Sequence, residues 1–196
     1  KDDLGRTALM KASASGILRA VKTLIDKTKD VNAKDNQGNT ALTRASETGQ
    51  LEATRFLIER GAHLNSKDDA GNSALMKASG NGHLDVIKVL VDKRADLKTM
   101  DNDGNNALMR ASATGHLDVV NFLLGKGLDV NASDRNGETA LMKASKIGAT
   151  EIVKTLIHKG ALVSTKDKDG HTAIRFAANK GFFSIVGLLK DYGGEE

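Results

Sequence analysis

One cluster of residues recurs every 33 positions, six times along the 196-residue chain. In its most regular form it runs from Asp through Gly, Thr-Ala-Leu, Ala-Ser and a second Gly to a Val- and Leu-rich stretch. A strict period of this length predicts a stack of similar supersecondary units, each resting on its neighbours. We therefore expect one domain over residues 1–196 without internal linkers, with repeats at about 2–34, 35–67, 68–100, 101–133, 134–166 and 167–196.

Composition limits what such a stack is made of. Hydrophobic residues make up 39% of the chain but aromatic residues only 3%, so the core must consist of Leu, Val, Ile and Ala. The absence of Cys excludes disulfides and Cys-based zinc sites. No apolar run is long enough for a transmembrane helix, so we expect no membrane insertion. The net charge of +4 is too small to indicate a class of partner.

The fifth copy, residues 134–166, illustrates how one unit is built. Its Gly137 suits the positive φ of a tight turn, and Thr139 can cap the first turn of a short helix rich in Ala and Ser. Gly148 ends that helix, and apolar residues at 152, 153, 156 and 157 form one stripe of a second helix that ends at Gly160. Residues 162–164 are predicted to be extended. Each unit is thus predicted to be a turn followed by two helices.

These features resemble the ankyrin repeat, from Asp2 to about Gly193. The resemblance rests on the period, the Asp-x-x-Gly-x-Thr-Ala-Leu step, Gly-His-Leu at 82–84 and 115–117, and Val-Asn-Ala at 31–33 and 130–132. The family's usual Thr-Pro-Leu-His is Thr-Ala-Leu-Met here, as at 7–10, and Ala is an equally good helix former. The resemblance, to a bacterial-type array, implies an all-α repeat solenoid: a curved stack of helix-turn-helix units with β-hairpin tips and a concave face that binds protein partners.

Five cations occupy the same position of the predicted first helix, and we call them the cation ladder: Lys11, Arg44, Lys77, Arg110 and Lys143. Because neighbouring helices pack about 8–10 Å apart, the ladder would extend over roughly 40 Å. One interpretation is an electropositive groove that complements an acidic or mixed surface of a partner. The other is a solvated face whose aliphatic stems cover the Ala-rich helices and whose charges are compensated by nearby acids.

The sixth copy breaks the ladder, because Arg175-Phe176 places an aromatic residue at the ladder position. We expect Phe182 and Phe183 to close the core of this last unit, and Phe176 to be an exposed anchor for a partner. Two apolar residues at positions where solvent is expected, Met100 and Ile147, are further candidate anchors.

The hairpin tips and the ends of the first helices are the other candidate contact regions, since ankyrin proteins commonly vary these positions for recognition. The tip residues that we select for partner binding, together with the ladder, Arg175 and the three anchors, are Asp69, Asn72, Asp103, Asn105, Arg135 and Glu138.

Two copies depart from the regular end of the second helix. Thr28 in the first copy and Arg94 in the third stand where the regular copies have Gly. A non-Gly residue in the left-handed region is strained, so we expect these helix ends to be either remodelled or strained.

The sequence argues against an enzyme and against a cofactor. It contains no nucleophile elbow, phosphate loop or metalloprotease motif. His83 and His116 belong to the Gly-His-Leu step, where we expect them to join adjacent turns, and the other three His occupy three different repeat positions. We therefore predict no metal site. The Asp that opens each copy is interpreted as a turn residue.

A repeat array acts by occupying the surface of another molecule. We expect this chain, a monomer on its own, to mask, inhibit or protect a partner protein, for example an enzyme restrained by a bacterial self-protection protein. A passive scaffold that joins two proteins is the alternative. Binding of an acidic polymer such as nucleic acid is a third possibility, although the basic residues are not interleaved with aromatic ones. We expect no small-molecule substrate. Since the chain starts at Lys1, we expect removal of an upstream segment, and the location stays open between cytoplasm and periplasm.

Overall fold

The computed structural model describes residues 1–28 and 30–194 of the chain. Those residues form twelve helices and no strand, and they divide into two compact units, Lys1–Asn102 and Asp103–Glu196. Each unit contains three consecutive helix pairs. The predicted all-α repeat fold is confirmed; that the six repeats act as a single domain stays a prediction.

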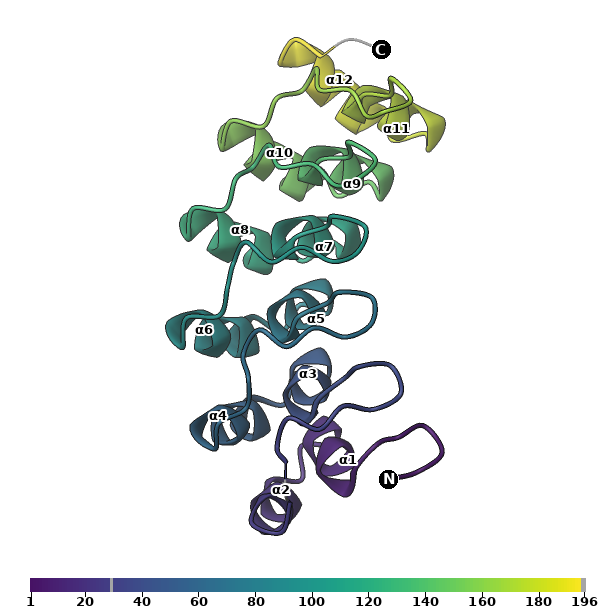
Figure 1. The fold of residues 1–196 in the computed structure, drawn as a ribbon. Coiled ribbons are helices and arrows are strands. Elements are labelled where there is room, and N and C mark those ends of the chain that lie inside the picture. Colours follow the sequence, from purple (N-terminus) through teal and green to yellow (C-terminus); the bar gives the residue numbers. More distant parts are fainter. Residues whose placement is uncertain (29, 195–196) are drawn as a thin grey trace. The chain divides into compact units, whose positions relative to one another are not determined.

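In the first unit, each pair joins a short first helix to a second helix, which lies on the side away from the hairpin tip (Figure 1). The first helices α1, α3 and α5 contact one another in sequence, and so do the second helices α2, α4 and α6. Their bounds are α1 (Ala8–Ala14), α2 (Leu18–Ile25), α3 (Ala41–Glu47), α4 (Leu51–Glu59), α5 (Ala74–Gly80) and α6 (Leu84–Asp92).

The second unit repeats this arrangement. Its first helices α7, α9 and α11 stack in one row and its second helices α8, α10 and α12 in another. Their bounds are α7 (Ala107–Thr114), α8 (Leu117–Gly125), α9 (Ala140–Lys146), α10 (Thr150–His158), α11 (Ala173–Asn179) and α12 (Phe183–Asp191).

Side-chain caps explain where the first helices begin. At each start the N-cap side chain accepts a hydrogen bond from a backbone N–H of the first turn, which has no partner within the helix. In α1 and α3 the third helical residue also bonds back to the cap, so Thr7 and Thr40 form complete capping boxes. The six caps are Thr7, Thr40, Ser73, Asn106, Thr139 and Thr172.

Small residues allow the helix rows to approach closely. In α9, for example, Ala140, Leu141, Met142 and Ala144 are all buried, and α10 contributes a buried stripe that includes Val153. Burial of Leu, Ile and Val side chains contributes about 1.5–3 kcal/mol each, so this apolar core stabilises the stack.

The hairpin tips are turns that bond to the tips of neighbouring repeats. In the first unit the N–H of Asn36 donates to Leu4 O (3.0 Å), Asp69 N–H to Gln37 O (3.0 Å) and Asn102 N–H to Ala70 O (2.9 Å). Within the described part of the chain, the one isolated β-bridge joins Ser133 to Thr139. The side-chain amides of Asn36 and Asn102 add a second bond each, to Asp3 O (3.1 Å) and Asp69 O (2.8 Å), so both backbone and side chains hold neighbouring tips together.

Three local expectations have different outcomes. Phe183 is 75% exposed, so the expectation that it closes the core is wrong; Phe182 is half-buried, with its ring against Gly148. Residues 163 and 164 form a turn and not an extended segment. Arg94 has φ 68°, and no other non-Gly residue among those described has a positive φ, so Arg94 is strained whereas the backbone at Thr28 is remodelled.

Candidate functional site

The tip surface of each unit consists of its hairpin tips and the exposed sides of its first helices. In the first unit it carries Lys11 on α1, Arg44 on α3 and Lys77 on α5, which lie on successive stacked helices. In the second unit it carries Arg110 on α7 and Lys143 on α9. Each unit thus holds its own part of the predicted ladder.

Ladder cations bind the Asp that opens their own repeat. Lys11 Nζ lies 2.8 Å from an oxygen of Asp2, and Arg44 Nη2 lies 2.7 Å from Asp35 Oδ2. The same contact joins Lys77 to Asp68 (3.1 Å) and Lys143 to Asp134 (2.7 Å). In these four repeats the positive charge is neutralised within the repeat, as the second interpretation of the ladder requires.

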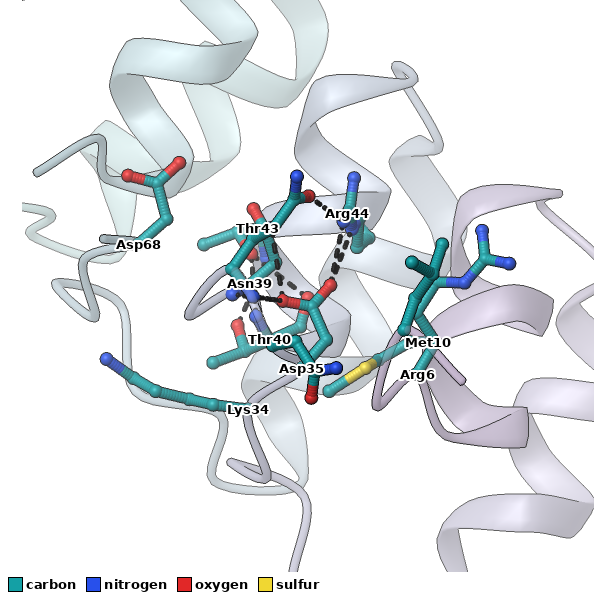
Figure 2. A network of polar contacts seen from close by, with 12 residues as sticks. Arg6, Met10, Lys34, Asp35, Asn39, Thr40, Thr43, Arg44 and Asp68 are labelled. Carbon is teal, nitrogen blue, oxygen red and sulfur yellow. Dashed lines mark hydrogen bonds and ion pairs between the residues drawn. The ribbon is translucent and has the colours of Figure 1, made fainter. Parts of the chain in front are cut away.

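Asp35 is the best-defined of these acids, as Figure 2 shows. Its Oδ1 accepts from the backbone N–H groups of Asn39 (2.8 Å) and Gln37 (3.0 Å), while Oδ2 accepts from Arg44. Burial by itself would raise the pKa of Asp35, but the Arg44 guanidinium and these hydrogen bonds outweigh it and lower the pKa below its ordinary value. The Asp35 carboxylate therefore stays charged while fixing both the turn and the ladder cation.

The acid in the first repeat is held in the same way at a more open position. Asp2 accepts from Lys11 and also from Nε of Arg6, at 2.9 Å. The hydrogen bond from the Lys11 ammonium group is the main reason that the pKa of Asp2 lies far below its usual range.

Glu47 joins the second and third repeats. Its Oε2 lies 3.3 Å from Nη1 of Arg44, and its Oε1 lies 3.2 Å from Nζ of Lys77 on the next first helix. Together with Asp35 and Asp68, these residues form an alternating chain of three carboxylates and two cations. The tip surface here is of mixed charge.

A related network crosses the last two repeats of the second unit. Lys143 contacts Glu138 as well as Asp134, and Glu138 also pairs with Lys146. Lys146 Nζ lies 4.1 Å from the centre of the Phe176 ring, a cation–π contact. Glu138 therefore lies at the tip, as predicted, and its ion pairs also connect the tip to α9.

Phe176 is half-buried and does not offer the fully exposed aromatic ring that we expected of an anchor. Besides Lys146, it contacts the ring of His171 edge-on, with 5.6 Å between the ring centres. His171 in turn lies 3.3 Å from Asp167, through Nδ1. Burial would raise the pKa of Asp167, but hydrogen bonds from the backbone of His171 and Asp169 and the nearby His171 ring outweigh it and lower the pKa.

The remaining candidate anchors lie at different places. Met100 (43% exposed) follows α6, and Ile147 (44% exposed) ends α9. Arg175 is exposed on α11, at the position where the earlier repeats bury Met10, Thr43, Met76, Met109 and Met142.

The predicted tip residues fall into two groups. Asp69, Asp103 and Arg135 are exposed at the tips, so a partner can reach them. Asn72 and Asn105 are half-buried, and Asn72 donates from its backbone to Asp68 Oδ1 (2.7 Å), which makes it part of the turn.

Two charged residues of these networks, Glu47 and Lys146, were missed as site residues. The ladder cation follows its Asp by nine positions in every one of the first five repeats, and this spacing could have predicted the pairing. Both residues lie at the end of a first helix, a region expected to vary for recognition, but each charge occurs in one repeat, so the period itself gave no signal for them.

The predicted structural role of His83 is confirmed. Its Nε2 lies 3.0 Å from the backbone oxygen of Glu47, and its ring covers Gly49. His83 thus joins two adjacent repeats.

One group of possible metal ligands occurs within the described residues, formed by Asp167, Asp169 and His171, with ligand atoms within 4.8 Å of one another. Asp167 already accepts from the backbone N–H groups of the other two residues, as turn residues commonly do. The turn accounts for the cluster.

Three copies of a family model described as ankyrin repeats match residues 1–68, 64–134 and 129–196. No curated protein matches the chain. Among the described residues, none of the helices has the length and apolar character needed to span a bilayer. The matched residues together cover the chain, and the paired helices follow the same repeat. The chain therefore belongs to the ankyrin-repeat family, whose repeats are protein–protein interaction modules and typically non-catalytic.

Proposed function

We propose that this chain binds a partner protein through its tip surfaces and thereby masks, inhibits or protects that partner. The observation that carries the proposal is that ankyrin repeats occupy residues 1–196, so the surface available for function in this sequence is that of the repeats. A role as a bacterial self-protection protein acting on an enzyme, in the cytoplasm or periplasm, and without catalysis of its own, belongs to the same proposal.

The charges of the tip surface support a partner of mixed charge more than a uniformly acidic one. Side chains of Lys77 and Lys143 are each only 13% exposed and already contact two carboxylates. Exposed tip residues of both signs, such as Asp69 and Arg135, lie beside them. A partner therefore meets alternating charges, which favour register and specificity.

The same pairing weighs against nucleic acid as the ligand. Binding to a polyanion depends on unneutralised Lys and Arg that displace counterions from phosphates. In four repeats the ladder cation is already bound to an acid. The affinity of a protein partner is expected to fall less steeply with salt than that of a polyanion.

Affinity capture from native cell extract tests the proposal, with matched charge variants. The tip variant combines Asp69→Arg with Arg135→Glu, and the control combines Asp85→Arg with Lys154→Glu on the second helices. All four residues are exposed, each variant changes one residue per unit, and both leave the net charge unchanged.

We expect the parent and the control to capture one protein that the tip variant loses. An assay of that protein should show loss or protection of its activity at a one-to-one ratio. Two proteins captured at separate surfaces, with no change in the activity of either, would support the scaffold instead. Capture of nucleic acid alone would overturn the proposal.

A further inference from the structure

A cavity of about 350 Å³ opens on the tip surface of the first unit, between the second and third repeats. Its wall includes Asn39 from one tip, Asp68 and Asp69 from the next, and Glu47 from α3. Arg44 and Lys77 complete the charged part of the wall. Figure 2 shows Asn39, Arg44 and Asp68 in this region.

The charges of this wall do not balance. It carries three carboxylates, Glu47, Asp68 and Asp69, against the two cations of the ladder. Lys77 is shared between Glu47 and Asp68, and Arg44 is directed mainly to Asp35. Within the described residues, the exposed Asp69 carboxylate has no ion-pair partner. The cavity is therefore short of one positive charge.

Asn39 provides a second, independent sign of a missing ligand. The residue is 2% exposed, and its side-chain Oδ1 has no hydrogen-bond donor among the described residues. A buried acceptor without a partner costs about 1–3 kcal/mol, so it requires an explanation.

The orientation of this amide is determined by its surroundings. Asn39 Nδ2 lies 3.3 Å from Asp35 Oδ1, so the amide donates towards that carboxylate. Exchanging the amide nitrogen and oxygen would place two acceptors against each other, which is unfavourable. Because Nδ2 faces Asp35, the buried Oδ1 is left as an acceptor without a donor, in a residue that lines the cavity.

We infer that this cavity receives a basic side chain, arginine or lysine, from the partner protein. The inference rests on the proposed function and specifies the chemistry of one contact within it. A guanidinium or ammonium group supplies both missing features: an N–H donor for Asn39 Oδ1 and a positive charge for Asp69 and Glu47. Charge-assisted hydrogen bonds of this kind are stronger than neutral ones, and an arginine fork can reach two acceptors at once.

The inference is tested by NMR titration of the ¹⁵N-labelled chain with three small probes: N-acetyl-arginine amide, Nα-acetyl-lysine amide and N-acetyl-glutamate amide. We expect saturable shifts with the two cationic probes, confined to residues around Asn39, Glu47 and Asp69. The acidic probe should not shift these signals. Equal shifts with the acidic probe, or no saturable shift with either cationic probe, would overturn the inference.

Two variants locate the binding to the cavity. Glu47→Gln removes one charge at constant shape, and we expect it to weaken binding of the arginine probe about tenfold. Asn39→Ala, which leaves the backbone bonds to Asp35 in place, should also weaken it. Glu52→Gln, at an exposed position on α4, is the control and should bind as the parent does. Unchanged binding in both cavity variants would refute the assignment.

The two proposals fail in different ways. If the arginine probe binds as described but extract yields no protein, the cavity assignment stands and the proposed function fails. If a partner is captured equally by the parent and both cavity variants, the proposed function stands and the cavity is not a partner contact.

Discussion

Nη2 of Arg44 lies 2.7 Å from Oδ2 of Asp35, a carboxylate whose side chain is only 1% exposed. Asp35 opens the hairpin turn of the second repeat, and Arg44 lies nine residues later in α3. The pair therefore couples the turn to the first helix. Its recurrence in three other repeats makes it a building element of the array as well as part of the tip surface.

Removing the charge of Asp35 should destabilise the protein. We expect Asp35→Asn to lower the free energy of unfolding by about 1–3 kcal/mol, because it weakens the hydrogen bonds to Arg44 at a buried position. The exposed pair of Lys88 and Asp85 on α6 is the control, and Asp85→Asn should cost less than about 0.5 kcal/mol. Urea unfolding followed by circular dichroism measures both, and equal losses would contradict the structural role of the pair.

Acid should remove part of the stability. The folded-state pKa values of Asp35 and Asp167 are lowered, so their contribution is fully present above the ordinary carboxyl pKa of about 4. It is lost as the pH falls through the lower folded-state values. We expect the urea midpoint to be steady from neutral pH to about pH 5 and to fall below about pH 4, less steeply in Asp35→Asn. An unchanged slope in that variant would show that Asp35 does not contribute.

Replacing Arg94 by Gly should stabilise the third repeat. Arg94 holds φ 68°, a conformation that costs a non-Gly residue about 1–2 kcal/mol, part of which is offset by the greater unfolded-state freedom of Gly. We expect a net gain of about 0.5–1 kcal/mol. Thr28→Gly is the matched control and should give no gain, since Thr28 lacks a positive φ. A loss of stability in Arg94→Gly would mean that contacts of the Arg side chain outweigh the strain.

The stability cost of crowding between neighbouring tips can be measured separately from the cost of backbone strain. Gly71 and Gly61 have nearly equal φ, 84° and 85°, but a Cβ on Gly71 would lie 2.7 Å from the backbone nitrogen of Asn102, whereas one on Gly61 would meet nothing within 4 Å. Both Ala variants should lose about 1–2 kcal/mol, and Gly71→Ala about 1–3 kcal/mol more. Thermal unfolding measures the difference, and equal losses would show that the tips separate at no cost.

Two buried Ser residues of the first helices test whether a buried hydroxyl group without a hydrogen-bond partner lowers the stability. Ser145 Oγ is buried without a hydrogen-bond partner in the described part of the chain, whereas Ser79 Oγ donates to Leu75 O at 2.8 Å. We expect Ser145→Ala to be neutral or stabilising by up to about 1 kcal/mol, and Ser79→Ala to cost about 1 kcal/mol. Unfolding free energies that change in the same direction in both variants would argue against this distinction.

The sequence alone determined the repeat, the helix pairs and their caps. The reason is local: a Thr or Ser before an Ala-rich stretch and a Gly after it specify where a short helix begins and ends, and the 33-residue period repeats that signal six times. The period also identified Thr28 and Arg94 as irregular helix ends, although only the structure showed that Arg94 keeps the positive φ and Thr28 does not.

Only the tertiary structure decided what the ladder cations contact and how the tip surface is charged. The nine-residue spacing favours the pairing of each ladder cation with the Asp of its own repeat. A side chain with several rotatable bonds can also reach solvent or the neighbouring repeat, and the period does not show which of these contacts forms. Glu47 meets both Arg44 and Lys77 because α3 and α5 stack side by side, and Asn39 keeps an unpaired oxygen because Asp35 occupies its amide nitrogen. The Glu47–Lys77 contact joins two stacked helices through residues 30 positions apart, whereas the Asn39–Asp35 contact depends on side-chain orientation within one turn. A repeating sequence pattern encodes neither.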